Sequence, residues 1–306
     1  MFLPIWALIA IAGHIANGAA FVIDKSLLST SFKRAATYAG TVGILGVFAS
    51  VLFFFGAGLP HGIGWLYSTI AGASFILALW MFFQALGQGE ASRIVPIVGS
   101  LIPILTFAGT FLFMGEVLTS SQTIGFALLI IATIILAGGS SSHRLTSRAI
   151  VSACIAAFLF AVASVSIKLG YDTDGFMTTF TTSRIIGAIM AVLLVFMDPK
   201  ATRELFRAVF PKPSSKKSAK NGALWLVMIG QTLGAGGFVL VQYAMSMGSA
   251  SIVNALQAVQ YAFLVLVAFA LAKRAPKLLG EDLTPKTITR KLIAILLTAI
   301  GLWLAV

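Results

Sequence analysis

The sequence predicts an all-α integral membrane protein with ten transmembrane helices, arranged as two inverted five-helix repeats around a central cavity. Composition, the spacing of apolar runs and the charges of the loops support this prediction. Of the 306 residues, 59% are apolar, 10% are charged, and the mean hydropathy is +1.01. An average soluble domain carries roughly 25% charged residues and cannot hide so much apolar surface. A soluble enzyme and a disordered chain are therefore excluded, and the single cysteine, Cys154, excludes a disulfide scaffold.

Ten apolar runs of spanning length follow one another along the chain. A membrane-spanning helix needs about 20 mostly apolar residues. The runs cover residues 3–25, 36–58, 64–86, 91–114, 119–138, 148–170, 175–197, 222–247, 250–272 and 287–305. The first run lacks the charged start and small-residue cleavage motif of a signal peptide, so we expect a retained helix. Segment 198–221, which contains PKPSSKKSAK, is expected to be a basic cytoplasmic loop.

The basic residues predict the orientation of the chain. If ten helices alternate in direction, the connections after every odd-numbered helix hold all 21 Lys and Arg residues except Lys168 and Arg184. The positive-inside rule makes that side cytoplasmic and places both termini outside the cell. The net charge of +12 does not indicate a nucleic-acid partner, because apolar runs separate the basic residues.

Two short motifs recur in the two halves of the chain. ALGQGEAS at 85–92 is similar to AMSMGSAS at 244–251, and GEVLT at 115–119 matches GEDLT at 280–284. Five helices in a half is an odd number, so the second half, 148–306, must enter the membrane upside down relative to the first, 1–140. Many secondary transporters contain such inverted repeats and bind their substrate at the membrane midplane.

The stretch from residue 85 to residue 136 resembles the third-to-fifth-helix region of an EamA-type half in the drug/metabolite transporter superfamily, and residues 222–305 repeat it more weakly. Lys25 and Lys168 fall where such halves often carry a lysine, and Arg184 falls where their second helix often carries an arginine. The resemblance implies ten helices, a central cavity, export or exchange of small metabolites, and a bacterial cytoplasmic membrane. Many members are thought to keep their termini in the cytoplasm, whereas the loop charges here place them outside.

Polar side chains within the runs mark a candidate substrate path, because such residues are costly in lipid and usually face the bundle interior or a water-filled cavity. The candidates are His14, Asn17, Trp80, Gln84, Arg184, Gln231, Gln242, Asn254, Gln257 and Tyr261. The last three share one helix face. The alternative role for such residues is interhelical hydrogen bonding, worth about 0.6 kcal/mol each. His14 is either a packing residue or a proton carrier.

Other residues in and between the runs predict local structure. Pro96 and Pro103 each remove a helix hydrogen bond, which either bends the fourth helix towards a cavity or is tolerated without a role. Glu116 and Glu281, in the two GE-x-L-T turns, are expected to cap the helices that follow them. Small residues that favour close helix approach are Gly40, Gly43, Gly46, Gly230 and Gly234.

The function expected from these features is that of a secondary transporter rather than an enzyme. It would move small polar or amphiphilic metabolites, such as amino acids, by alternating access and in the direction of export, and a monomer would suffice. No Asp or Glu lies near the middle of any run, where a proton relay would need one, so His14 is the main candidate for proton coupling, and no cofactor or metal motif is present. The alternatives are a non-transporting membrane scaffold and a carrier of anionic or phosphorylated metabolites. Such anions could be attracted by Lys25, Arg93, Lys168 and Arg184.

Overall fold

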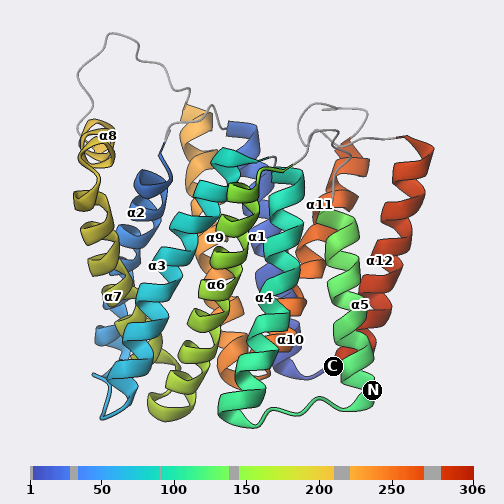
Figure 1. Ribbon diagram of the computed structural model, residues 1–306, viewed down its shortest axis with the longest axis horizontal. Helices are drawn as coiled ribbons and strands as arrows, with labels where there is room; N and C mark the ends of the chain where they lie inside the picture. The colour runs from blue at the N-terminus through green and yellow to red at the C-terminus, as the bar shows by residue number, and fades with distance from the viewer. Residues whose placement is uncertain (1–2, 28–33, 90, 138–144, 210–220, 272–283) are drawn as a thin grey trace.

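The structure is a bundle of long helices that run alternately up and down, with both ends of the chain at the same end of the bundle (Figure 1). It is a computed structural model that describes residues 3–27, 34–89, 91–137, 145–209, 221–271 and 284–306. The helices are α1 (Ile5–Leu27), α2 (Ala35–Leu45), the 3₁₀-helix η1 (Gly46–Phe55), α3 (Gly64–Gln88), α4 (Ala91–Met114), α5 (Ser120–Ala137), α6 (Ser147–Asp174), α7 (Phe176–Met197), α8 (Pro199–Val209), α9 (Asn221–Met247), α10 (Ala250–Ala255), α11 (Gln257–Leu271) and α12 (Pro285–Ala305).

Within the described residues, eight segments are long and apolar enough to cross a membrane, which makes this an integral membrane protein. They are Ile5–Ile23, Ala35–Phe55, Gly64–Gln88, Arg93–Met114, Ser147–Asp174, Phe176–Met197, Ala250–Ala270 and Thr287–Ala305. α5 is apolar but shorter, and α9 is long but carries Gln231 and Gln242 in its described part. The prediction of ten spans therefore stays a prediction for these two helices.

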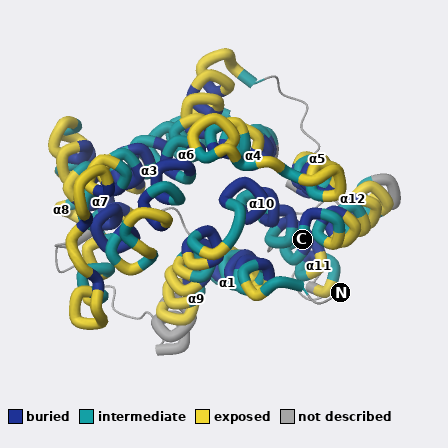
Figure 2. The backbone as a smooth tube through the Cα atoms, turned by 90° about the horizontal axis from the view of Figure 1, so that it is seen from below, coloured by how far each residue is buried: buried dark blue, intermediate teal, exposed yellow. Residues whose placement is uncertain are grey.

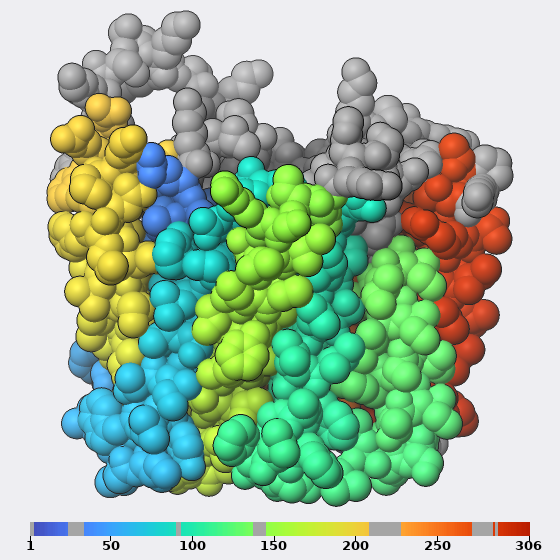
Figure 3. All heavy atoms as spheres, viewed as in Figure 1, coloured from blue at the N-terminus to red at the C-terminus, as the bar shows by residue number. Residues whose placement is uncertain are grey.

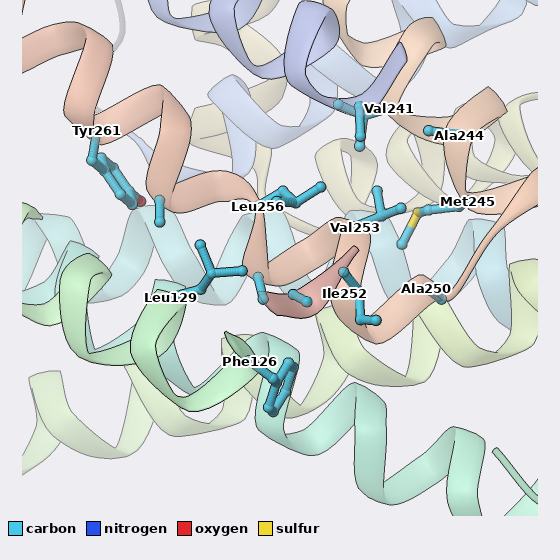
Figure 4. Close-up of a cluster of buried hydrophobic side chains, with 14 of the residues drawn as sticks. Phe126, Leu129, Val241, Ala244, Met245, Ala250, Ile252, Val253, Leu256 and Tyr261 are labelled. Atoms are coloured by element: carbon cyan, nitrogen blue, oxygen red, sulfur yellow. The ribbon is translucent and has the colours of Figure 1, made fainter. Parts of the chain in front are cut away.

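The outside of the bundle is apolar, as lipid requires. Phe54 is 88% exposed, Met197 83% and Phe113 73%. α6 packs between α3 and α4, and α5 packs along α12 (Figures 2 and 3). α9 packs along α1 (Figure 2). The apolar interior is continuous around α10, where Ile252, Val253 and Leu256 lie among side chains of α5 and α9 (Figure 4).

Glycines let the helices approach closely, as predicted for Gly40 and Gly43. A Cβ atom at either position would overlap a side chain of α7. On α9 the prediction named Gly230 and Gly234, but Gly234 has only ordinary contact with Ala20. The glycine in direct backbone contact with α1 is Gly237, where a Cβ atom would lie 2.8 Å from the Gly13 carbonyl oxygen.

α4 continues as one helix through Pro96 and Pro103. The Ser100 hydroxyl donates a hydrogen bond of 2.6 Å to the Pro96 carbonyl oxygen. Pro103 has no N–H to donate to the carbonyl oxygen of Gly99, four residues earlier. The missing bond therefore falls at a residue that lines the cavity described below.

The expected loop 198–221 contains a helix, α8, and residues 210–220 lie outside the described residues. Asp198 caps α8, because its Oδ1 accepts hydrogen bonds from the backbone N–H groups of Lys200 (3.0 Å) and Ala201 (3.2 Å). Arg34, before α2, donates to Asp198 Oδ2 at 2.6 Å. Desolvation raises the pKa of Asp198, but these hydrogen bonds outweigh it and hold that pKa below its ordinary value. α8 is amphipathic and is seen nearly along its own axis in Figure 1, across the upper end of α7.

The cap predicted for Glu116 is wrong. α5 is capped by Thr119, whose hydroxyl accepts from the Gln122 N–H at 3.2 Å while the Gln122 side chain accepts from the Thr119 N–H at 3.1 Å. Glu116 instead accepts a 2.7 Å hydrogen bond from the Ser251 hydroxyl and so joins the α4–α5 turn to α10. Glu281 lies outside the described residues.

Candidate functional site

A cavity of about 270 Å³ lies between helices from both halves of the chain. At ~30 Å³ per water molecule it has room for about nine waters, which suits a small solute. Its polar lining consists of His14, Asn17, Ser164, Arg184, Gln242, Asn254, Gln257, Gln260 and Tyr261. Its apolar wall includes Phe75 and Phe82 of α3, Phe160 of α6 and Phe238 of α9.

Seven of the ten predicted site residues line this cavity: His14, Asn17, Arg184, Gln242, Asn254, Gln257 and Tyr261. The other three do not. Trp80 packs against the apolar cluster of α2, α3 and α7 that includes Ala39, Ile76 and Ala191. Gln84 lies half-buried on α3 outside the lining, and Gln231 is exposed on α9.

The aromatic wall and Ser164 are absent from the set of predicted site residues. Phe160 lies one turn before Ser164, and Phe238 lies one turn before Gln242, so each shares a helix face with a polar lining residue. Helical spacing from the polar residues could have identified both rings.

The helix that supplies Asn254 and Gln257 is interrupted at Leu256, between α10 and α11 (Figure 4). In a continuous helix the Val253 carbonyl oxygen would accept from the Gln257 N–H. Here it lies 3.0 Å from His14 Nε2, and because a carbonyl only accepts, Nε2 carries the hydrogen and donates it. The buried ring of His14 therefore satisfies a carbonyl at the helix break, which favours the packing role for this histidine.

Replacing His14 with alanine leaves that buried carbonyl without its donor. We expect the variant to lose about 1–3 kcal/mol of stability, the cost of an unsatisfied buried polar group. The measurement is the free energy of unfolding of the purified protein in detergent. His61→Ala is the control: the His61 side chain is 90% exposed and lies 3.3 Å from Asp174 Oδ1, and the loss of such an exposed pair should cost no more than about 1 kcal/mol. Equal stability of the two variants would show that the hydrogen bond to Val253 does not support the break.

Asn254, Gln257 and Tyr261 form one stripe along α10 and α11, and part of their hydrogen-bonding capacity is taken up by other protein groups. Asn254 Nδ2 donates to Thr106 Oγ1 and Ser164 Oγ, both at 3.1 Å, so its two amide hydrogens tie three helices together. Gln257 Nε2 donates to the Tyr261 hydroxyl at 3.0 Å. The side-chain oxygens of Asn254 and Gln257, the second amide hydrogen of Gln257 and the hydroxyl hydrogen of Tyr261 are left to face a solute. These residues thus make hydrogen bonds between helices and also line the cavity.

Arg184 brings a positive charge into this apolar region. It is only 9% exposed, and its Cζ lies 4.3 Å from the centre of the Phe75 ring and 5.2 Å from that of Phe238. Its Nε is buried and has no hydrogen-bond partner within the described part of the chain. No cluster of three or more metal-ligating side chains occurs among the described residues.

The fold and the cavity together define an α-helical integral membrane protein with a partly polar cavity between its helices. No family model matches the chain. An uncharacterized protein of Methanocaldococcus jannaschii is 37% identical over 70 residues, which are 23% of this chain and 50% of that protein. The chain thus covers about half the length of this curated relative. One solved crystal structure superposes over 97% of both chains with a TM-score of 0.64 at 16% identity, which shows a shared fold.

Proposed function

We propose that this protein is a secondary transporter of the EamA type, which moves small polar or amphiphilic metabolites across a bacterial cytoplasmic membrane by alternating access. The cavity is the observation that carries the proposal. Its lining comes from α1, α3 and α4 in the first half and from α6, α7, α9, α10 and α11 in the second. Transporters built from inverted repeats bind their substrates at such an interface, whereas a scaffold needs no polar cavity.

Two matching junctions support the inverted repeat of residues 1–140 and 148–306. A Cβ atom added at Gly89, at the α3–α4 junction, would lie 2.8 Å from Leu145 and 3.3 Å from Ala149, at the start of α6. A Cβ atom added at Gly248, at the α9–α10 junction, would lie 2.5 Å from the Trp6 ring, at the start of α1. Exchanging the halves converts one contact into the other, and the two junctions lie at opposite ends of the bundle (Figure 1).

The helix contacts also support two alternative states. Under the exchange of halves, the close α3–α6 contact corresponds to the close α9–α1 contact. α3 packs against α7 as well, but among the described residues α9 makes no comparable contact with α2 or η1. In the opposite state of a symmetric carrier, the α9–α2 contact would form and the α3–α7 contact would open. The structure would then be one of two states related by the repeat.

The loop charges predict the orientation of the chain, and the family resemblance implies the direction of transport. The predicted cytoplasmic end is the one that carries α8, and the termini lie at the other end. Export is the direction that the EamA resemblance implies. One chain contains the whole cavity, so a monomer suffices for this mechanism.

The experiment that tests transport places a thiol in the cavity. Replacing Cys154 with serine removes the only cysteine, and Ala163→Cys then adds one to the cavity wall. In proteoliposomes this thiol should react with a small membrane-impermeant methanethiosulfonate applied from either side. The control is Ala157→Cys, also on α6 but fully buried in an apolar cluster with Ile94 and Ala153. If both thiols stayed equally inert from both sides, the bundle would be closed and the scaffold interpretation would hold.

A further inference from the structure

The positive charge of the cavity wall comes from Arg184. Of the four cations that could attract an anion, Lys168 donates to Asp172 Oδ1 at 3.0 Å and is not part of the lining, and Arg93 is not part of it either. The side chain of Lys25 lies outside the described residues. Among the described lining residues there is no Asp or Glu. The guanidinium therefore faces the cavity without a carboxylate from the described part of the protein.

The aromatic rings around Arg184 do not satisfy its hydrogen bonds. Their faces attract the cation through its charge, but a guanidinium has five N–H donors that need oxygen acceptors. Nε is buried without a partner among the described residues. A charged side chain held this way inside a membrane is usually functional. A solute with an oxygen acceptor can supply the hydrogen-bond partner that Arg184 lacks among the described residues.

Gln242, on α9 one turn after Phe238, supplies a second donor. The Tyr171 hydroxyl donates to Gln242 Oε1 at 2.9 Å. Because the carbonyl end of this amide is occupied, its NH₂ group is the end left for the cavity that Gln242 lines. Phe238, on the same face of α9, lies against the Arg184 guanidinium. Arg184 and Gln242 thus present N–H donors from α7 and α9.

We propose that Arg184 and Gln242 bind the carboxylate of a small organic acid, whose apolar part lies against the aromatic wall. This substrate class rests on the transport function proposed above. A monocarboxylate balances one guanidinium, whereas a phosphate group brings a charge of about −1.5 to −2 and would leave an excess. The Phe75 ring lies 5.8 Å from that of Phe160 and 5.6 Å from that of Phe238, so the wall is continuous.

Binding to the purified full-length protein in nanodiscs tests this proposal. The probes are 3-phenylpropanoate and 4-methylpentanoate, their neutral amides, and inorganic phosphate. Each acid should bind at least about tenfold tighter than its amide, because a charge-assisted bidentate hydrogen bond is lost with the charge. Phosphate should bind more weakly than either acid.

Two variants assign the preference to Arg184. Arg184→Gln should bind acid and amide alike, and Arg184→Lys should keep part of the difference because it keeps the charge. Arg93→Gln, on α4 and outside the lining, is the matched control and should keep the full preference. If Arg184→Gln does not fold, the comparison of acid with amide on the unmodified protein still decides.

Three results on the unmodified protein would overturn the carboxylate assignment: equal binding of acid and amide, tighter binding of phosphate, or binding of no probe. A preference retained in folded Arg184→Gln would overturn the role of the arginine. None of these results bears on transport itself, which the thiol at position 163 tests without any ligand.

Discussion

Leucine in place of Gly237 is expected to separate α1 from α9, whereas leucine in place of its neighbour Gly236 is expected to change little. A Cβ atom at Gly237 would lie 2.5 Å from Asn17 Oδ1 and 2.8 Å from the Gly13 carbonyl oxygen. The Gly13 oxygen is backbone, so a side-chain rotation cannot relieve the overlap. At Gly236, which is exposed, nothing lies within 4 Å.

The expected loss for Gly237→Leu is at least about 3 kcal/mol, the upper end of the usual cost of overpacking, because two backbones must move apart. The measurement is the free energy of unfolding of both variants in detergent, together with their yield of monodisperse protein. Both substitutions add the same side chain to the same helix, so differences in helix propensity and hydrophobicity cancel. Equal stability would mean that α1 and α9 do not pack through Gly13 and Gly237.

The long helices could be predicted from hydropathy because the thickness of a bilayer imposes a minimum apolar length. The predicted fourth run, 91–114, coincides with α4. α8 could not be predicted in the same way, because eleven residues with several charges have the composition of a loop. Its helix depends on the Asp198 cap and on contacts with α2 and α7.

The break at Leu256 has no sequence signal, because neither proline nor glycine occurs in α10 or at the break. It depends on a tertiary contact, the hydrogen bond from His14 to Val253, which no local pattern reveals. A residue-by-residue reading of the ninth run therefore predicts one continuous helix where the structure has two.

Within the site, the types of residue that line the cavity could be predicted, but the directions in which the side chains point could not. On α3 the lining residues are Ala71, Phe75, Leu79 and Phe82, which form one stripe at helical spacing. Trp80 and Gln84 lie on the adjacent stripe, which packing turns away from the cavity. On α9, Gln231 lies two turns before Phe238, about 10 Å along the helix and beyond the lining.

Alternating access in this protein requires that the α3–α7 contact close one side of the cavity. A disulfide across it is available, because a Cβ atom at Gly187 would lie 3.5 Å from Ile76 Cγ1, the atom that a cysteine sulfur would replace. The control disulfide joins Ala20→Cys to Gly234→Cys, whose Cβ atoms would be 3.5 Å apart across α1 and α9. The α1–α9 interface corresponds to the α3–α6 interface when the halves are exchanged, so it should persist in both states.

The decisive measurement is the labelling of Ala163→Cys from each side of the membrane, in Cys154→Ser protein that carries one or the other disulfide. With Ile76→Cys and Gly187→Cys oxidised, the account predicts that the cavity thiol reacts from one side only. With the α1–α9 disulfide it should react from both sides. Reaction from both sides while the α3–α7 disulfide is closed would contradict alternating access through this contact.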